Sequence, residues 1–119
     1  MKVKSYRDLI VWQKAMELVV KVYEITEDFP REEAYGLTSQ IRRAAISIPS
    51  NIAEGKSRST KKDYAHFLRI AYGSGAELET QIEIAKRLKK IQNLEYAEVD
   101  TLLNEVMKML NVILHKLTS

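Results

Sequence analysis

Two stretches of the sequence, Ile48-Pro-Ser-Asn-Ile-Ala-Glu-Gly55 and Phe67-Leu-Arg-Ile-Ala-Tyr-Gly-Ser-Gly-Ala-Glu-Leu-Glu-Thr-Gln-Ile82, decide the fold of this chain. Both place apolar or small residues at helical spacing, and only a short polar segment separates them. Two helices joined by so short a connection pack as antiparallel neighbours. The segment between the two stretches therefore predicts a tight corner.

This corner is basic. Lys56, Arg58, Lys61 and Lys62 lie in it, opposed only by Asp63. Lys61 and Lys62 fall in the predicted first turn of the second of these helices, where the helix dipole disfavours cations. Because neither helix propensity nor the dipole favours lysine there, the corner is the strongest candidate for a functional surface.

The remaining sequence predicts two more helices. Apolar residues recur at spacings of three and four along almost the whole chain. The expected helices span residues 6–28, 32–58, 61–91 and 94–117, in a single domain over residues 1–119. Since all connections are short, the predicted fold is all-α, an up-down-up-down antiparallel four-helix bundle.

Local signals refine these helices. Ser5 with Asp8, and Thr60 with Asp63, have the spacing of a capping box. Pro49 lies inside the second helical pattern, where proline removes a backbone donor and clashes with the preceding turn. Since the apolar pattern resumes after Pro49, we expect a kink in the second helix rather than a break.

A register follows for the hairpin formed by the second and third helices. Folding back around Ser59 places residue n opposite roughly residue 118 minus n. This register brings two arginines within about a turn of two glutamates: Arg42 and Arg43 on one helix, and Glu77 and Glu79 on the other. We interpret these charges as interhelical ion pairs, with a polar site between helices as the functional alternative.

Glycine inside a helix costs on the order of 1 kcal/mol relative to alanine. We therefore expect Gly73 and Gly75 to permit close approach of the second and third helices, with Gly75 near Arg43.

The first and last helices are apolar over a wider face than one neighbour requires. The first carries two adjacent stripes, Leu9, Trp12, Met16, Val19 and Tyr23 beside Val11, Ala15, Leu18, Val22 and Ile25. The last helix repeats this doubling between Val99 and Leu117. A surplus apolar stripe predicts a further partner, and we expect a homo-oligomer.

Composition limits the classes of function. The 119 residues include no cysteine and 45% hydrophobic residues, which fits a helical domain without disulfides or thiolate metal sites. No segment approaches the roughly 18 apolar residues of a membrane span, so we expect a soluble, cytoplasmic protein with no membrane contact. His66 and His115 have no second histidine at helical spacing, and no nucleophile elbow is present. We expect no enzyme activity, no catalytic residue, no metal and no cofactor.

The net charge of +3 is unevenly distributed. A second basic group lies near the predicted end of the third helix and consists of Lys86, Arg87, Lys89 and Lys90. Because the helix dipole favours cations at that end, we interpret this group as structural. The candidate phosphate contacts are the corner and its neighbours: Arg42, Arg43, Lys56, Arg58, Lys61, Lys62 and Arg69.

Three motifs carry a resemblance to a known family. They are Tyr6-Arg-Asp-Leu-Ile-Val-Trp-Gln-Lys-Ala-Met16, Ser47-Ile-Pro-Ser-Asn-Ile-Ala-Glu-Gly55 and the block from Phe67 to Gln81. In this order, and over essentially the whole chain, they resemble the four-helix-bundle proteins encoded in intervening sequences of bacterial 23S rRNA genes, sometimes labelled ribosomal-protein-like. The resemblance implies a ring-shaped homopentamer and kinship with accessory proteins of diversity-generating retroelements, which contact a reverse transcriptase and nucleic acid. It implies no established biochemical activity.

Two classes of function remain open. The first is a nonenzymatic oligomer that binds nucleic acid, RNA in particular but also DNA, through phosphate contacts without base reading. The second is an assembly scaffold or accessory subunit whose partner is another protein, such as a reverse transcriptase, with basic patches that provide electrostatic complementarity.

Overall fold

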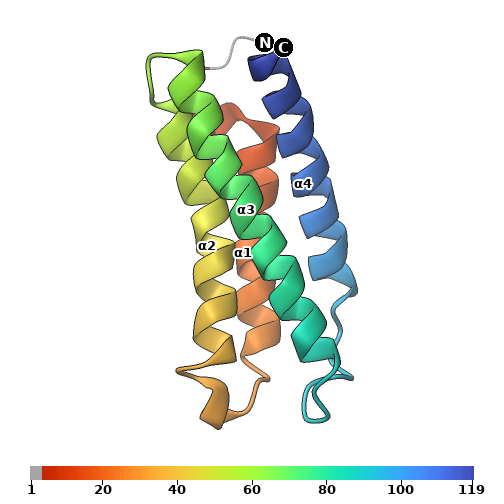
Figure 1. Ribbon diagram of the computed structural model, residues 1–119. Coiled ribbons are helices and arrows are strands. Elements are labelled where there is room, and N and C mark those ends of the chain that lie inside the picture. Colours follow the sequence, from red (N-terminus) through yellow and green to blue (C-terminus); the bar gives the residue numbers. More distant parts are fainter. Residues whose placement is uncertain (1–3) are drawn as a thin grey trace.

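The computed structural model describes residues 4–119 and is all-α over that range, with four helices and no strand (Figure 1). The helices are α1 (Ile10–Thr26), α2 (Leu37–Lys56), α3 (Lys61–Lys86) and α4 (Ala97–Thr118), and two 3₁₀ turns, η1 (Tyr6–Asp8) and η2 (Arg31–Glu33), precede α1 and α2. The predicted all-α class is confirmed.

Each helix packs against two others. α1 contacts α2 and α4, and α3 contacts the same two helices, whereas no close backbone contact links α1 with α3 or α2 with α4 within residues 4–119. Figure 1 shows the beginning of α1, the end of α4 and the corner between α2 and α3 at the same end of an elongated molecule of 45 × 24 × 21 Å. These pairings are consistent with the predicted antiparallel arrangement.

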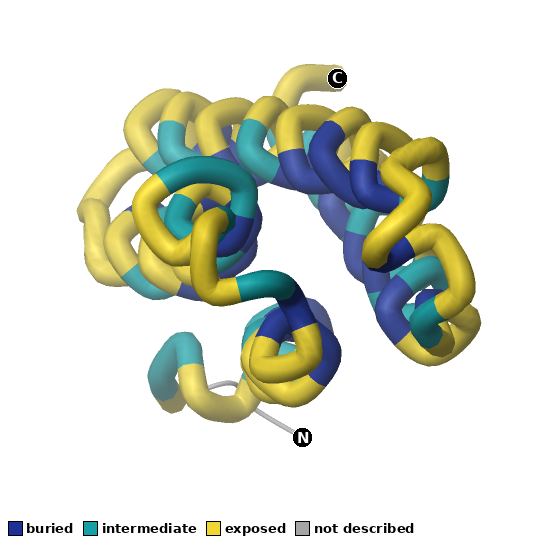
Figure 2. Tube along the Cα trace, turned by 90° about the horizontal axis from the view of Figure 1, so that it is seen from below, coloured by how far each residue is buried: buried dark blue, intermediate teal, exposed yellow. Residues whose placement is uncertain are grey.

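The core lies between the four helices. Figure 2 shows the buried positions turned toward the interior and the exposed positions turned outward. The largest fully buried side chains come from every helix and include Leu18, Ile41, Ile48, Leu68, Leu78, Ile82 and Leu110. Each such side chain stabilises the fold by about 1.5–3 kcal/mol relative to its exposed state.

The first two helices begin later than predicted. The Ser5–Asp8 capping box is present, but it caps the start of η1 rather than the start of α1. The extended backbone of Leu9 (φ −75°, ψ 125°) separates η1 from α1. α2 begins at Leu37 because Gly36, with φ −114° and ψ −110°, interrupts the helical path that starts at η2.

The connection between α3 and α4 is longer than predicted. α3 ends at Lys86 rather than near residue 91, and α4 begins at Ala97 rather than near residue 94. Ile91 continues the apolar spacing of α3, but it is buried as part of a loop that folds back on the core. The Tyr96 hydroxyl holds this loop by donating to the backbone oxygen of Ile91 at 2.8 Å.

α2 runs without interruption through Pro49, so the proline does not break it. Two side chains bond to the turn that precedes the proline ring. Ser50 Oγ donates to the Ile46 carbonyl and Asn51 Nδ2 donates to the Ser47 carbonyl, each at 2.8 Å. The kink expected at Pro49 stays a prediction.

The register between α2 and α3 differs from the predicted one by about three residues, nearly one turn. Ser47 Oγ lies 2.8 Å from Ser74 Oγ, whereas the predicted register places Ser47 opposite Ala71. The difference has a steric cause at Gly55. A Cβ added there would lie 2.9 Å from Phe67 Cβ and 3.1 Å from the Tyr64 carbonyl oxygen, so the missing side chain lets α3 seat against α2 at this point.

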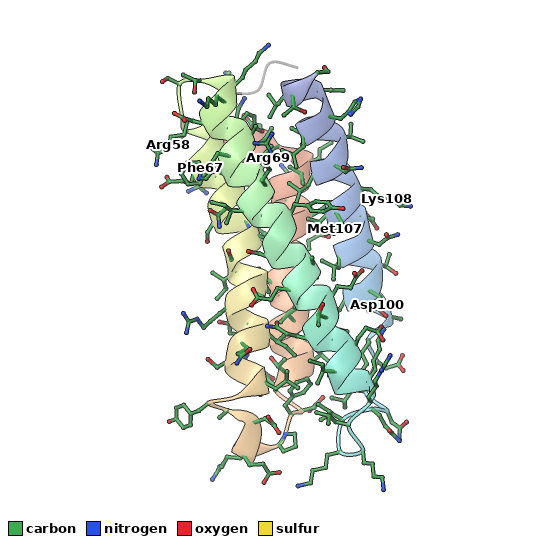
Figure 3. The ribbon with its side chains drawn as sticks, viewed as in Figure 1. Arg58, Phe67, Arg69, Asp100, Met107 and Lys108 are labelled. Atoms are coloured by element: carbon green, nitrogen blue, oxygen red, sulfur yellow. The ribbon has the colours of Figure 1, made fainter. Side chains whose placement is uncertain are left out.

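The expected roles of two other glycines were wrong. Gly73 has nothing within 4 Å of the position its Cβ would take, so it permits no close approach. Gly75 is buried, but the side chain that fills its space is Met107 of α4, labelled in Figure 3, rather than a residue of α2. A leucine at position 75 would therefore crowd α4 and not the seam near Arg43.

Alanine substitutions distinguish the glycines. We expect Gly55→Ala to lower the free energy of unfolding by about 1–3 kcal/mol, because its Cβ would meet backbone and Cβ atoms of α3. Gly73→Ala serves as the matched control and should raise the free energy of unfolding by up to about 1 kcal/mol, since alanine favours helix and meets no neighbour. Urea unfolding followed by circular dichroism measures both. Equal effects of the two substitutions would contradict the packing at Gly55.

Candidate nucleic-acid interface

The corner is built by the end of α2 and the beginning of α3. α2 ends at Lys56, α3 begins at Lys61, and the Thr60 hydroxyl accepts a hydrogen bond from the Asp63 backbone N–H at 3.1 Å. This cap satisfies one of the free donors at the start of α3. It fixes the direction in which the first turn, and the lysines on it, leave the corner.

Two of the corner cations lie against aromatic rings. Lys56 Nζ is 5.5 Å from the centre of the Tyr64 ring, and the Arg58 guanidinium is 4.8 Å from the centre of the Phe67 ring. Figure 3 shows Arg58 and Phe67 beside each other at this end of the molecule. Arg58 Nη2 also pairs with the Glu54 carboxylate at 3.3 Å, and both side chains are well exposed. Burial raises the pKa of the Tyr64 hydroxyl.

Lys61 and Lys62 have a different environment. Both are exposed, and within residues 4–119 neither forms an ion pair with a carboxylate. Lys62 and Arg69 are seven residues apart on one face of α3, which places them about 10 Å from each other along the helix. Arg69 is also exposed. Lys61, Lys62 and Arg69 therefore present positive charge to solvent without a paired carboxylate among residues 4–119.

Arg42 and Arg43 are not part of this cluster. Arg42 Nε donates to Thr26 Oγ1 at 2.8 Å, and the guanidinium lies 4.3 Å from the centre of the Tyr23 ring, so it is held against α1. The ion pairs predicted for the two arginines with Glu77 and Glu79 are absent from the described residues, because the register differs and Arg42 turns toward α1. Arg43 is exposed, about 20 Å along α2 from Lys56.

Two of the four cations in the second basic group, Lys86 and Lys90, are paired with acidic side chains. Lys86 Nζ lies 2.7 Å from Asp100 of α4, and its pKa is raised chiefly by that hydrogen bond. Lys90 Nζ lies 2.8 Å from Glu32 of η2, a contact that also raises its pKa. These contacts tie the end of α3 and the following loop to distant parts of the chain. They agree with the structural interpretation of this group.

A groove follows the seam between α1 and α4. One part, of about 640 Å³, is lined by Met16, Val20 and Leu102, and a second part, of about 800 Å³, is lined by Ile10, Met109 and Val112. Gln13 lines both parts. The exposed fractions of Ile10, Val20 and Val112 are 62%, 53% and 54%. Ile10, Val20 and Val112 lie outside the stripes expected from the sequence. Of the expected stripe residues, Met16, Leu102 and Met109 line the groove, and Met16 is 40% exposed.

A polar pocket beside the corner was missed in the sequence. It is lined by Tyr6, Ser50, Asn51, Ala53, Glu54, Ser57 and Phe67. The sequence did contain one sign of this pocket. Polar residues 50 and 54 of the motif that ends at Gly55, and residue 57 just after it, recur at the spacing of one helix face. The contribution of Tyr6 depends on the packing of η1 against α2 and has no local signal.

No group of three or more histidine, aspartate or glutamate side chains among residues 4–119 could hold a metal ion. No helix in the same range has the length and hydropathy required to cross a membrane.

A family model described as the 23S rRNA-intervening sequence protein matches residues 7–112. The chain belongs to the 23S rRNA-intervening sequence protein family. The matched region runs from Arg7 in η1 to Val112 in α4, so it contains the basic corner and every lining residue of the polar pocket except Tyr6. The family resemblance seen in the sequence is confirmed. A comparison with curated proteins finds no match.

The hydrogen bond between Tyr96 and Ile91 can be tested for its contribution to the stability of the loop between α3 and α4. Tyr96→Phe should lower the free energy of unfolding by about 1–3 kcal/mol, because the buried Ile91 carbonyl loses its donor. Burial also raises the pKa of Tyr96 from 10.0 to about 12. The neutral hydroxyl therefore contributes stability that is complete below pH 10 and declines as the pH rises toward 12.

Unfolding by urea between neutral and strongly alkaline pH measures both effects. In Tyr96→Phe the alkaline decline should be shallower than in the wild type. Tyr72→Phe, a change at an exposed ring, is the control and should reproduce the wild-type profile. A wild-type profile in Tyr96→Phe would show that the hydroxyl does not hold this loop.

Proposed function

We propose that this protein is a nonenzymatic, homo-oligomeric nucleic-acid-binding protein of the cytoplasm, with RNA as its principal ligand. The observation that carries this proposal is the pair of exposed lysines, Lys61 and Lys62, in the first turn of α3. A cation in the first turn of a helix costs roughly 0.3–1 kcal/mol through the helix dipole. A phosphate bound between the two lysines and the start of α3 would be attracted by both the lysines and the helix dipole, so the unfavourable interaction would be replaced by a favourable one.

The corner suits a phosphate backbone. Free backbone N–H groups and the dipole make a helix N-terminus attractive to anions, and two lysines on the same turn add full charges. Arg69 continues the positive surface along α3, and Arg58 borders it at the end of α2. Contacts of this kind hold phosphates regardless of sequence, so affinity should fall steeply with salt.

The oligomer rests on the groove between α1 and α4. Its apolar lining and the exposure of Ile10, Val20 and Val112 favour burial against a second copy of the chain. The family resemblance supports a five-membered ring. In such an assembly the corner would be repeated, and several weak phosphate contacts would combine into strong binding through effective concentration.

The same groove favours a second candidate. Helix-lined apolar grooves bind amphipathic segments of other proteins. The chain would then act as an accessory subunit of a protein partner such as a reverse transcriptase, and the corner would provide electrostatic complementarity to it.

A double substitution tests the nucleic-acid proposal. Lys61→Gln with Lys62→Gln should weaken binding to a structured RNA and reduce the slope of log affinity against log salt by about 1.5–2, because two phosphate contacts are lost. Fluorescence anisotropy at several salt concentrations measures this slope. Arg87→Gln with Lys89→Gln removes the same charge from the second basic group and should leave the slope near the wild-type value.

Equal losses in the two double variants would mean that only net charge matters, and the corner would not be the interface. No salt-dependent binding of the wild type to RNA or DNA at low ionic strength would reject the nucleic-acid proposal in favour of the scaffold.

Sedimentation equilibrium at micromolar concentration tests the assembly. The wild type should sediment as a homo-oligomer, and Val20→Glu should shift it to smaller species with unchanged helix content, since a carboxylate would have to be buried in the apolar contact. Ile84→Glu, at an exposed apolar position of α3, is the matched control. A monomeric wild type would refute the assembly.

A further inference from the structure

The pocket beside the basic corner has two aromatic side chains from different elements. Tyr6 of η1 and Phe67 of α3 both line a cavity of about 500 Å³, together with polar residues of α2 and Ser57, the residue that follows it. This volume falls within the range of small-ligand sites. Aromatic rings and a few polar groups in one cavity are suited to a flat ligand that carries its own hydrogen-bonding edge.

The polar groups of α2 in this pocket are oriented as acceptors. Ser50 Oγ and Ser57 Oγ each donate their proton to a backbone carbonyl one turn earlier, at 2.8 and 2.9 Å. Asn51 Nδ2 donates to the Ser47 carbonyl and to Ser47 Oγ. The hydroxyl oxygens, the Asn51 amide oxygen and the Glu54 carboxylate are therefore left to accept. Such a pocket selects a ligand that presents donors.

Arg58 shows that the Phe67 ring can be covered by a planar group. Its guanidinium lies over the ring at 4.8 Å and pairs with Glu54 at 3.3 Å. Because Arg58 and Glu54 are both well exposed, their pairing contributes little stability and exchanges easily. A ligand can therefore replace Arg58 on the ring, and the released guanidinium remains within reach of a phosphate attached to that ligand.

We propose that this pocket binds one unpaired nucleobase that carries an exocyclic amino group, that is adenine, cytosine or guanine, within a single-stranded nucleic acid. The base stacks on Phe67, its amino group donates to the acceptors of α2, and its phosphate lies at Arg58 and the lysines of the corner. This inference rests on the proposed function and adds to it a preference among bases.

The local charge favours a base over a cationic side chain. The pocket has one carboxylate, Glu54, which is already paired with Arg58, the corner cation that also covers the Phe67 ring. An arginine or lysine of a partner protein would be repelled by Arg58, whereas a nucleotide brings its own negative charge. Uracil and thymine would place carbonyl oxygens against the acceptors of α2, which disfavours them relative to adenine and cytosine.

The test uses single-stranded RNA homopolymers of equal length, composed of adenine, cytosine or uracil, with the full chain. Trp12, the single tryptophan, contacts the Tyr6 ring with centroids 5.3 Å apart, so its fluorescence should report occupancy of the pocket. Anisotropy supplies the affinity. The adenine and cytosine polymers should bind about fivefold or more tightly than the uracil polymer and should change the Trp12 emission.

Two variants locate the preference. Phe67→Leu keeps the Cβ that packs on Gly55 but removes the ring, so it should weaken adenine binding about fivefold, whereas Tyr72→Leu at an exposed ring should not. Ser50→Ala with Ser57→Ala removes two acceptors, one inside α2, where alanine favours the helix, and one at the exposed residue that follows it. This second variant should bring the adenine and uracil affinities together even if Phe67→Leu fails to fold.

Other results would overturn the inference. Equal affinity for all three polymers, unchanged by these variants, would leave nucleic-acid binding intact and reject the base pocket. Binding of none of them at low salt, with structured RNA still bound, would reject the base pocket alone, whereas loss of binding to structured RNA and DNA as well would also reject the proposed function. A change in Trp12 emission with an arginine-rich peptide and with no polymer would reassign the pocket to a cationic side chain.

Discussion

The contact between Gly55 and Phe67 is the constraint on which the rest of this structure depends. The Cβ of Phe67 and the backbone of Tyr64 occupy the space that a side chain at position 55 would fill. This contact sets the register of α2 against α3, and the register brings Ser47 opposite Ser74. It also places the Phe67 ring where Arg58 can cover it. The register of α2 against α3, the basic corner and the polar pocket therefore all depend on the same steric contact.

The two basic groups show how packing separates charges that look alike in sequence. Lys86 and Lys90 find Asp100 and Glu32, residues brought close by the loop between α3 and α4 and by η2. Lys61 and Lys62 find no carboxylate among residues 4–119. A paired cation is already engaged by its own fold, whereas an unpaired one retains its attraction for an external anion. Pairing alone does not separate the two groups, because Arg58 of the corner pairs with Glu54 while Arg87 and Lys89 have no carboxylate partner among residues 4–119. The position of Lys61 and Lys62 in the first turn of α3, where the dipole disfavours cations, is what supports the choice of the corner.

Local sequence predicted the existence of all four helices better than their ends. Periodic apolar residues identify a helix, but Ile91 keeps the period of α3 although it anchors a loop. The capping box predicted at Ser5 forms, but it caps the start of η1 and not the start of α1. Gly73 and Gly75 could not be told apart in sequence, because the difference lies in Met107 of another helix.

By itself, the sequence determined the all-α class, the family, the basic corner and the surplus apolar stripes, because each depends on residues close together along the chain. Tertiary structure decided the register of α2 and α3, the engagement of Arg42 by Thr26 and the pairing of Lys86 with Asp100. It also decided that Tyr6 and Phe67 line one pocket. These features join residues from separate elements, and their distances are set by steric fit in the packed core, which spacing along one helix does not encode.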